Sequence, residues 1–306
     1  MFNISIVSFF ERLFFKPNIL DWVFISLLSP LSILFGLSMF LRRVLSPKKN
    51  YTIPIISIGN LTVGGSGKTP FVIQLASKYS DSFIISRGYG RESRGLIEVS
   101  SRGKILTDVF SSGDEPMLMA KSLPNASVIV SEDREIAINL AIEQGAKVIF
   151  LDDGFNRVNI KKFDILLFPQ NIKNFMPFPA GPFREFIFTK YFANLNVVEN
   201  RDFRRVVTIQ NPTTRMLLVT AISNPKRLEP FLPDNIVDRI YFKDHAYFDE
   251  AELKEKMNLS NATSILVTQK DEVKMSSFKL PLSVMKLELQ IKNEILEKID
   301  KYIGEY

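Results

Sequence analysis

A glycine-rich stretch in the first quarter of the chain has the composition of a phosphate-binding loop. Residues 58–70 read IGNLTVGGSGKTP. Glycines allow backbone N–H groups to converge on phosphate oxygens without Cβ clashes, while a lysine can reach the terminal phosphates and a threonine hydroxyl can bind Mg²⁺. Thr62 stands where the strict pattern has its first glycine, and the doubled glycine would supply the turn. We predict a loop that binds phosphate groups through Thr62, Val63, Gly64, Gly65, Ser66, Gly67, Lys68 and Thr69.

Two adjacent carboxylates follow an apolar run in VIFLDDGF, residues 148–155. At a strand end in a phosphate-loop protein, this position holds Mg²⁺ directly or through water. Because neighbouring strand residues point in opposite directions, one aspartate can face the metal and the other a different group. We therefore predict a metal site made by Thr69, Asp152 and Asp153.

Two further residues have weaker signals when each is taken alone. Asp114 lies in SGDEP, residues 112–116, which reads as a turn between strands because Gly-Asp and Pro favour turns. His245 is the only histidine of the chain, and a single histidine is more often structural than catalytic.

The elements around these residues predict a parallel, doubly wound sheet. The loop stands between a predicted strand, 51–60, and a predicted helix that begins at Thr69, which is the context that a phosphate loop requires. Strands and helices alternate from there to residue 169. Ligands of such sheets bind beyond the carboxyl ends of the strands, where the polar residues Lys68, Thr69, Arg87, Asp152 and Asp153 fall.

A second, smaller α/β unit is predicted from four further strand-like segments. These are residues 215–222, 238–242, 264–273 and 282–291, with a helical segment at 249–257. The polar segments ENRDF and QNPTT interrupt the pattern near 200–214 and suggest a boundary. We expect a membrane-anchor segment in 1–49, a phosphate-loop domain in 50–205 and a C-terminal α/β domain in 206–306.

The N-terminal segment is apolar enough to enter a membrane. Residues 20–40 form a run about as long as the ~20 residues that cross a bilayer, although Asp21, Pro30 and several serines interrupt it. Basic residues follow the run directly, which favours an uncleaved anchor with its basic flank in the cytoplasm. Residues 4–15 are aromatic-rich and could lie in the interface plane, and a buried core helix is the alternative for 20–40.

Composition excludes several kinds of site. The chain of 306 residues has no cysteine and one histidine, so disulfides, thiol nucleophiles and histidine-based zinc sites are excluded. The net charge is +6, but six basic and only two acidic residues fall in the first fifty. Because the remainder is nearly balanced, we expect no nucleic-acid partner.

Taken in order, the motifs resemble those of the tetraacyldisaccharide 4′-kinases of lipid A biosynthesis. They are IGNLTVGGSGKTP, SRGYGR, SGDEP, SEDR, LDDGF, PAGPFRE, KDHAYF and VTQKDEVK, and they span nearly the whole chain. The resemblance implies two α/β/α domains with the active site in the cleft between them, at the cytoplasmic face of the bacterial inner membrane. It also implies transfer of the ATP γ-phosphoryl group to the 4′-hydroxyl of tetraacyldisaccharide 1-phosphate, a lipid held in the bilayer, giving lipid IVA.

The resemblance also implies a role for each matching residue. Asp114 would be the base for the sugar hydroxyl with His245 as its partner, Lys68 and Thr69 would bind ATP and Mg²⁺, and no obligate protein partner is expected. Arg87, Arg134, Arg184 and Glu185 would bind substrate. Asn156 and Arg157 after DDGF, and Ala246 after DH, depart from the usual family pattern.

Two other classes of protein compete with this interpretation. Membrane-associated phosphate-loop ATPases of the partitioning or targeting type carry a lysine just before the paired glycines, but Val63 stands there in this chain. A nucleotide-binding membrane scaffold without catalysis would have no use for carboxylates at 114, 152 and 153.

Overall fold

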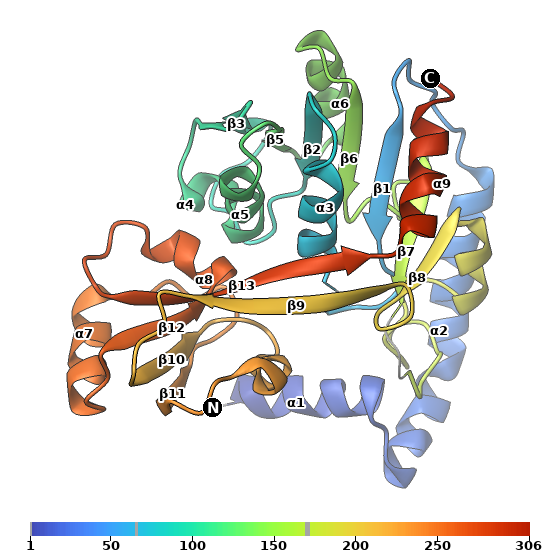
Figure 1. Ribbon diagram of the computed structural model, residues 1–306. Helices are drawn as coiled ribbons and strands as arrows, with labels where there is room; N and C mark the ends of the chain where they lie inside the picture. The colour runs from blue at the N-terminus through green and yellow to red at the C-terminus, as the bar shows by residue number, and fades with distance from the viewer. Residues whose placement is uncertain (1, 65–66, 169–171) are drawn as a thin grey trace. The chain divides into compact units, whose positions relative to one another are not determined.

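The computed structural model describes residues 2–64, 67–168 and 172–306, and the chain divides into two compact units. The first unit contains Met1–Lys68, Leu151–Phe203 and Ile291–Tyr306, and the second contains Thr69–Phe150 and Arg204–Gln290. Each unit combines strands with helices (Figure 1), which confirms the α/β class. The three-part division at residues 49 and 205 stays a prediction.

Parallel strands form the core of the first unit. β1 (Ile55–Gly59) pairs with β7 (Phe163–Phe168), and β7 pairs with β8 (Leu195–Val198). All five residues of β1 are buried, as expected for a strand covered on both faces. The C-terminal helix α9 (Asn293–Ile303) packs here, because the Tyr302 hydroxyl donates a hydrogen bond to the Ile55 carbonyl at 3.3 Å.

The N-terminal segment of the first unit forms two helices, α1 (Phe2–Phe15) and α2 (Ile19–Leu45). Asn18 begins α2 with a capping box that it shares with Asp21, a device that satisfies free N–H groups of the first turn. Pro30 lies inside α2 without ending it. Within the described residues, α2 is the one helix long and apolar enough to cross a membrane.

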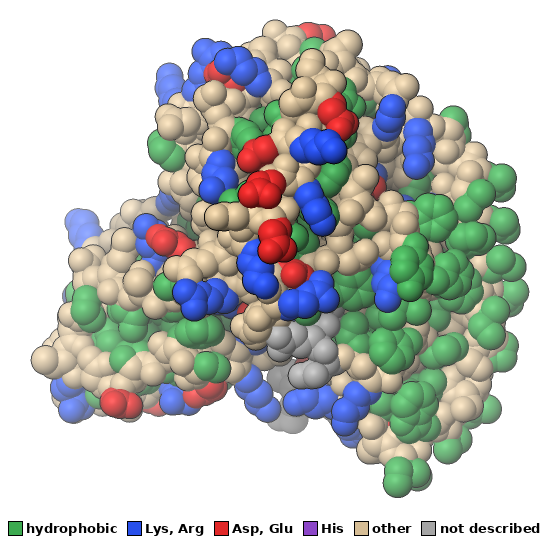
Figure 2. All heavy atoms as spheres, turned by 45° about the vertical axis from the view of Figure 1, so that its right-hand side comes forward, with side chains coloured by type: hydrophobic (Ala, Val, Ile, Leu, Met, Phe, Trp, Pro, Cys, Tyr) green, Lys and Arg blue, Asp and Glu red, His purple; other side chains and the backbone are tan. Residues whose placement is uncertain are grey.

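One face of α2 is fixed to the first unit by specific contacts. The Ala180 N–H donates to the Ser32 hydroxyl at 2.8 Å, and Gly36 leaves the space that the Phe186 ring fills. Near the end of the helix, Arg43 makes a buried double hydrogen bond to Glu185, 2.7 Å at each oxygen, and lies over the Phe155 ring. The opposite face is apolar and exposed, as Figure 2 shows on its right-hand side; among its residues are Leu20, Val23, Leu27, Leu31, Leu34 and Leu41.

In the first part of the second unit, the strands follow the order β4-β3-β5-β2-β6. Its strands are β2 (Ser82–Ser86), β3 (Ile97–Ser101), β4 (Lys104–Ile105), β5 (Ser127–Val130) and β6 (Val148–Asp152). β2 and β5 run parallel, while β3 is antiparallel to β5. The accompanying helices are α3 (Lys68–Ala76), α4 (Val109–Ser112), α5 (Asp114–Ser122) and α6 (Arg134–Glu143). The boundary between the units falls inside β6 and after the first residue of α3.

The remainder of the second unit is a five-stranded sheet in the order β11-β10-β12-β13-β9. The strands are β9 (Phe203–Gln210), β10 (Met216–Thr220), β11 (Ile236–Tyr241), β12 (Ser264–Thr268) and β13 (Leu282–Ile291). The helices are α7 (Glu250–Leu259), α8 (Gln269–Glu272) and the 3₁₀ turns η2 (Pro225–Phe231) and η3 (Val273–Met275). Leu217, Val219, Ile265 and Val267 are fully buried in its core.

Three expectations from the sequence differ from the structure. SGDEP is not a plain turn, because α5 begins at Asp114; the signal of a helix N-terminus, an acidic pair followed by proline, is also that of a turn. The predicted strand 264–273 ends at Thr268, whose side chain caps α8. The polar segment near 200–214 contains β9, a strand with alternating burial whose exposed positions are polar.

Replacing Arg43 with methionine should destabilise the first unit. The side chains of Arg43 and Glu185 are 6% and 3% exposed, and removal of one partner leaves a buried charge unpaired, at a cost of about 3–5 kcal/mol. We expect a loss of that size in the free energy of unfolding, measured by urea denaturation. Lys147→Met, which breaks the exposed ion pair with Asp81, is the control and should have little effect; equal losses would contradict the importance of burial.

Candidate active-site clusters

The predicted phosphate loop follows β1 and is held by a neighbouring segment of the first unit. The Val63 N–H donates to the Pro182 carbonyl at 2.8 Å, and Thr62 forms a bridge with Phe183. Gly64 and Gly67 have positive φ angles of 95° and 78°, which only glycine adopts at low cost. Gly65 and Ser66 lie outside the described residues.

Lys68 stands at the start of α3 and makes two polar contacts. Its Nζ donates to the Asn60 side chain at 3.1 Å and lies 3.5 Å from the Asp153 carboxylate. Thr69, the second residue of the helix, is buried. A helix N-terminus attracts anions through its free N–H groups and dipole, so this position of a lysine is suited to phosphate.

The two aspartates where β6 ends have different surroundings. Asp152 is buried, whereas Asp153 is partly exposed and has a left-handed φ of 52°. Arg184 donates to Asp153 at 2.9 Å, and the Arg184 backbone N–H is held by the Leu61 carbonyl. Burial raises the pKa of Asp153, but the charges of Lys68 and Arg184 outweigh it, and the pKa lies below its usual value.

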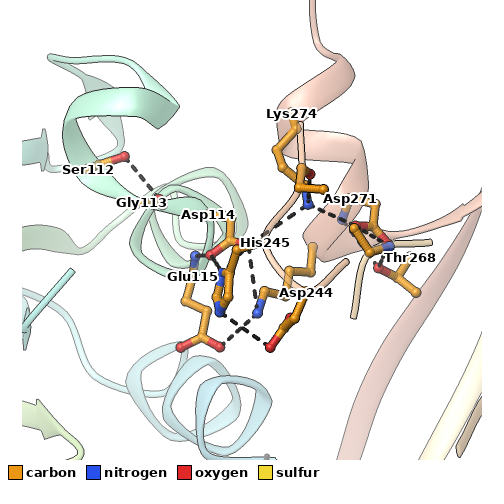
Figure 3. A network of polar contacts seen from close by, with 12 residues as sticks. Ser112, Gly113, Asp114, Glu115, Asp244, His245, Thr268, Asp271 and Lys274 are labelled. Atoms are coloured by element: carbon orange, nitrogen blue, oxygen red, sulfur yellow. Dashed lines mark hydrogen bonds and ion pairs between the residues drawn. The ribbon is translucent and has the colours of Figure 1, made fainter. Parts of the chain in front are cut away.

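A second cluster, in the second unit, joins Asp114 to His245 (Figure 3). Asp114 begins α5, and His245 follows β11 in a turn with a left-handed φ of 62°. The His245 Nδ1 lies 2.9 Å and 3.1 Å from the two oxygens of Asp114. Asp114 is 5% exposed while the His245 side chain is 23% exposed. The arrangement can accept and relay a proton at the edge of the surface.

Two lysines also surround the Asp114 carboxylate. Lys270 Nζ lies 3.7 Å from it and 3.1 Å from Glu115, and Lys274 Nζ lies 4.0 Å from it. Burial raises the pKa of Asp114, but the His245 hydrogen bond and the charges of Lys270, His245 and Lys274 reverse the effect and lower the pKa. The hydrogen bond that His245 donates to the Asp114 carboxylate raises the pKa of His245. A carboxylate that stays ionised beside an imidazolium or imidazole is the result.

The structure brings five of the predicted site residues into these two clusters. Lys68, Asp153 and Arg184 meet in the first unit, and Asp114 meets His245 in the second. Arg87 is exposed just after β2, and Arg134 is buried at the start of α6, where it donates to the Ser131 carbonyl. Glu185 is paired with Arg43 and buried, a position in which its carboxylate holds α2.

Four residues that sequence reasoning gave no role belong to the clusters. Asn60 holds Lys68, and Glu115, Lys270 and Lys274 complete the charges around Asp114. Asn60 directly follows a strand and precedes the glycine loop, which is a usable signal. The lysines stand four residues apart in QKDEVK, a spacing that places them on one side of a helix.

Comparison with known proteins identifies similar chains over nearly the full length. A sequence model of the tetraacyldisaccharide-1-P 4′-kinase family matches residues 24–304. A tetraacyldisaccharide 4′-kinase of Helicobacter acinonychis is 48% identical over 300 residues, covering 97% of this chain and 96% of that protein, and one of Aliarcobacter butzleri is 45% identical over 309 residues, covering 97% of each. A crystal structure of LpxK from Aquifex aeolicus in complex with ATP aligns with a TM-score of 0.76 at 27% identity, covering 92% of this chain and 99% of that one.

Proposed function

Because the chain belongs to the tetraacyldisaccharide-1-P 4′-kinase family, we propose that it transfers the γ-phosphoryl group of ATP to the 4′-hydroxyl of tetraacyldisaccharide 1-phosphate. The product of this reaction is lipid IVA in lipid A biosynthesis. The observation that carries the proposal is the hydrogen bond between the buried Asp114 carboxylate and His245, the chain's one histidine. A hydroxyl acceptor needs a base within reach of its proton, and this pair supplies it.

In the proposed reaction, the 4′-oxygen forms a bond to the γ-phosphorus as the bond from that phosphorus to the β–γ bridging oxygen breaks. The hydroxyl proton passes to the Asp114 carboxylate, and ADP leaves with the bridging oxygen. His245 orients the carboxylate through Nδ1 and can relay the proton to solvent, because its side chain is partly exposed. Phosphoryl transfer otherwise depends on positioning and charge neutralisation.

The cluster around Lys68 supplies that neutralisation in the proposal. Lys68 and Arg184 share one carboxylate, Asp153, so one positive charge remains for an anion. With ATP bound, Lys68 would exchange its contacts with Asn60 and Asp153 for phosphate oxygens. Arg184 and Arg87 are the proposed contacts for the substrate's anionic groups. Arg134 and Glu185 are both buried, which favours supporting roles, Arg134 through its bond to the Ser131 carbonyl and Glu185 through α2.

The residues proposed to hold Mg²⁺ have suitable chemistry. Asp152 is a buried carboxylate at the end of β6, and Thr69 presents a hydroxyl at the start of α3. Mg²⁺ prefers hard oxygen ligands and is commonly bound by one or two carboxylates together with substrate phosphates. When bound, the ion would neutralise charge on the phosphates; Asp152 and Thr69 would hold it, and Asp153, already paired with two cations, would orient Lys68 and Arg184.

The proposed location is the cytoplasmic face of the bacterial inner membrane, where the lipid substrate lies in the bilayer. The support is α2, whose exposed face is almost continuously apolar and whose last turn carries Arg42 and Arg43. The other face contacts residues 180–186 of the first unit through Ser32, Gly36 and Arg43. If α2 enters the bilayer with its apolar face while its other face stays packed against the first unit, both faces are accounted for. A helix that crosses the bilayer without contacting the protein would leave the packed face unexplained.

The kinase proposal is tested by incubating the full chain with labelled ATP and tetraacyldisaccharide 1-phosphate and separating the lipids by chromatography. Lys68→Ala should reduce product formation to near background, because the cation that neutralises the β- and γ-phosphate oxygens is lost. Lys78→Ala, an exposed lysine just beyond the same helix, should retain the wild-type rate. Wild-type turnover by Lys68→Ala at saturating ATP would refute the assignment of the loop.

Asp114 and His245 should act as one unit. Asp114→Ala and His245→Ala are each expected to lower kcat by about 10²-fold or more, the range of general-base effects, and the double variant should be little worse than the poorer single variant. Steady-state kinetics with the same lipid measures kcat for each variant. ATP binding should change little in each of them. Strictly multiplicative losses would mean that the two residues work independently.

The exposed face of α2 should determine membrane association. Leu27 and Leu34 are 73% and 64% exposed, so Leu27→Lys with Leu34→Lys adds charge to that face without disturbing the packed one, and a charged residue is unfavourable in hydrocarbon. Flotation with phospholipid vesicles should show reduced binding. Leu259→Lys, a comparably exposed leucine on α7, serves as the control, and undiminished flotation of the α2 variant would argue against insertion.

A further inference from the structure

Lys274 is a buried cation that lies near Asp114 and contacts the residue after His245. Its side chain is 1% exposed, and Nζ donates a hydrogen bond to the carbonyl of Ala246 at 3.0 Å and forms an ion pair with Asp271 at 3.0 Å. The Asp114 carboxylate lies 4.0 Å away in a third direction (Figure 3). An ammonium group has three N–H donors, and three neighbours of this one are the Ala246 carbonyl, Asp271 and Asp114.

Asp271 ties this lysine to the frame of the five-stranded sheet. It is fully buried and accepts hydrogen bonds from the Thr220 hydroxyl at 2.7 Å, the Thr268 hydroxyl at 2.8 Å and the Ala221 N–H at 3.2 Å. Thr220 ends β10 and Thr268 ends β12. Lys274 is therefore fixed with respect to two adjacent strand ends.

The turn that carries His245 depends on the same frame. The His245 N–H donates to the Ala221 carbonyl at 3.1 Å, and the next residue, Ala246, accepts the bond from Lys274. The left-handed φ of His245 is costly for a residue with a side chain and persists only where surrounding contacts enforce it. Both ends of this short turn are thus held by groups that Asp271 and Lys274 organise.

We propose that Lys274 is a positioning residue for phosphoryl transfer, which holds the His245 turn through the Ala246 carbonyl and places its ammonium group 4.0 Å from the Asp114 carboxylate. This inference rests on the proposed role of Asp114 as the base. Lys274 touches neither reactant in the proposal and acts through Asp114 and His245. Lys270, which is bound to Glu115 and more exposed, contributes charge but does not hold the turn.

The charged and titratable groups around Asp114 define what each substitution changes. His245, Lys270 and Lys274 face the carboxylate directly, with Glu115 behind Lys270, Asp244 beside His245 and Asp271 behind Lys274. Tyr247 is a further titratable group nearby. Burial raises its pKa most, and the negative charge of Asp114 raises it further. Lys274→Met removes a positive charge that lowers the pKa of Asp114, whereas Asp271→Asn keeps that charge and removes the negative charge competing for it.

The pH dependence of kcat therefore separates positioning of the pair from a purely structural ion pair. Activity is lost on the acid side as Asp114 becomes protonated. Lys274→Met should lower kcat by roughly 10-fold or more and move the acid limb toward higher pH, since the loss of a nearby positive charge raises a carboxyl pKa. Asp271→Asn should move the limb in the opposite direction, toward lower pH. Shifts in the same direction, or none in either variant, would overturn the proposal.

A spectroscopic readout tests the positioning without activity. Because His245 is the only histidine, a downfield Nδ1–H proton signal in the NMR spectrum belongs to the bond with Asp114. The signal should be lost or broadened in Lys274→Met and retained in Lys270→Met and in Lys279→Met, the exposed control on the same stretch. Retention in folded Lys274→Met would contradict the anchoring of the turn. If Lys274→Met does not fold, the direction in which Asp271→Asn moves the acid limb of the kcat profile still tests the proposal.

These measurements also separate this proposal from the kinase assignment. If the wild-type protein and Lys279→Met form no phosphorylated lipid, the proposed function fails, while the proton signal still reports whether Lys274 holds the pair. If the wild-type protein and Lys279→Met form product but the acid limbs of Lys274→Met and Asp271→Asn do not move as stated, the kinase assignment stands and Lys274 is only structural.

Discussion

A charge that leaves water must find an opposite charge and hydrogen bonds, and this constraint organises the second unit around Asp114. Its carboxylate is 5% exposed, a position that by itself favours the neutral acid. His245, Lys270 and Lys274 reverse that preference. Lys270 is paired with Glu115 and Lys274 with Asp271. Asp271 in turn accepts hydrogen bonds from the Thr220 and Thr268 hydroxyls. One ionised oxygen pair thus specifies the ends of β10 and β12, the start of α5 and the turn after β11.

The same constraint fixes α2 in the first unit. A helix with so apolar an outer face has no intrinsic reason to lie in one orientation against a protein. The pairing of Arg43 with Glu185, both almost fully buried, gives it one, because any rotation of the helix would separate two charges in a poorly solvated site. The Phe155 ring below Arg43 directly follows the turn that carries Asp153 and Gly154. The helix proposed to enter the membrane and the segment that carries Asp153, the partner of Lys68 and Arg184, therefore share a contact.

Much of this was predictable from sequence because the signals are local. β1, the glycine loop and α3 follow one another within about twenty residues, and a buried strand ending in two aspartates is visible as a hydrophobic run followed by carboxylates. The family resemblance then assigned Asp114 and His245 to one pair, which lies 131 residues apart in sequence and 2.9 Å apart in the structure. Glu185, Lys270 and Lys274 show the limit: each is an ordinary charged residue in sequence, and its role depends on which opposite charge the fold buries beside it. β9 was missed because its exposed residues are polar and period-2 alternation over eight residues is a weak signal next to turn-forming neighbours.

Backbone strain occurs in both charged clusters. Two of the seven non-glycine residues with positive φ angles in the described part of the chain are Asp153, directly after β6, and His245, after β11. Such conformations cost on the order of 1–3 kcal/mol and persist where surrounding contacts over-determine them. Asp153 is held by Lys68 and Arg184, and His245 by Asp114, the Ala221 carbonyl and the Lys274 contact to its neighbour. In both cases a polar side chain leaves the end of a strand at an angle that regular structure does not provide, and ion pairs compensate the strain. A phosphoryl-transfer enzyme works by holding charges in place, so the contacts that stabilise these two turns are the ones on which its chemistry would depend.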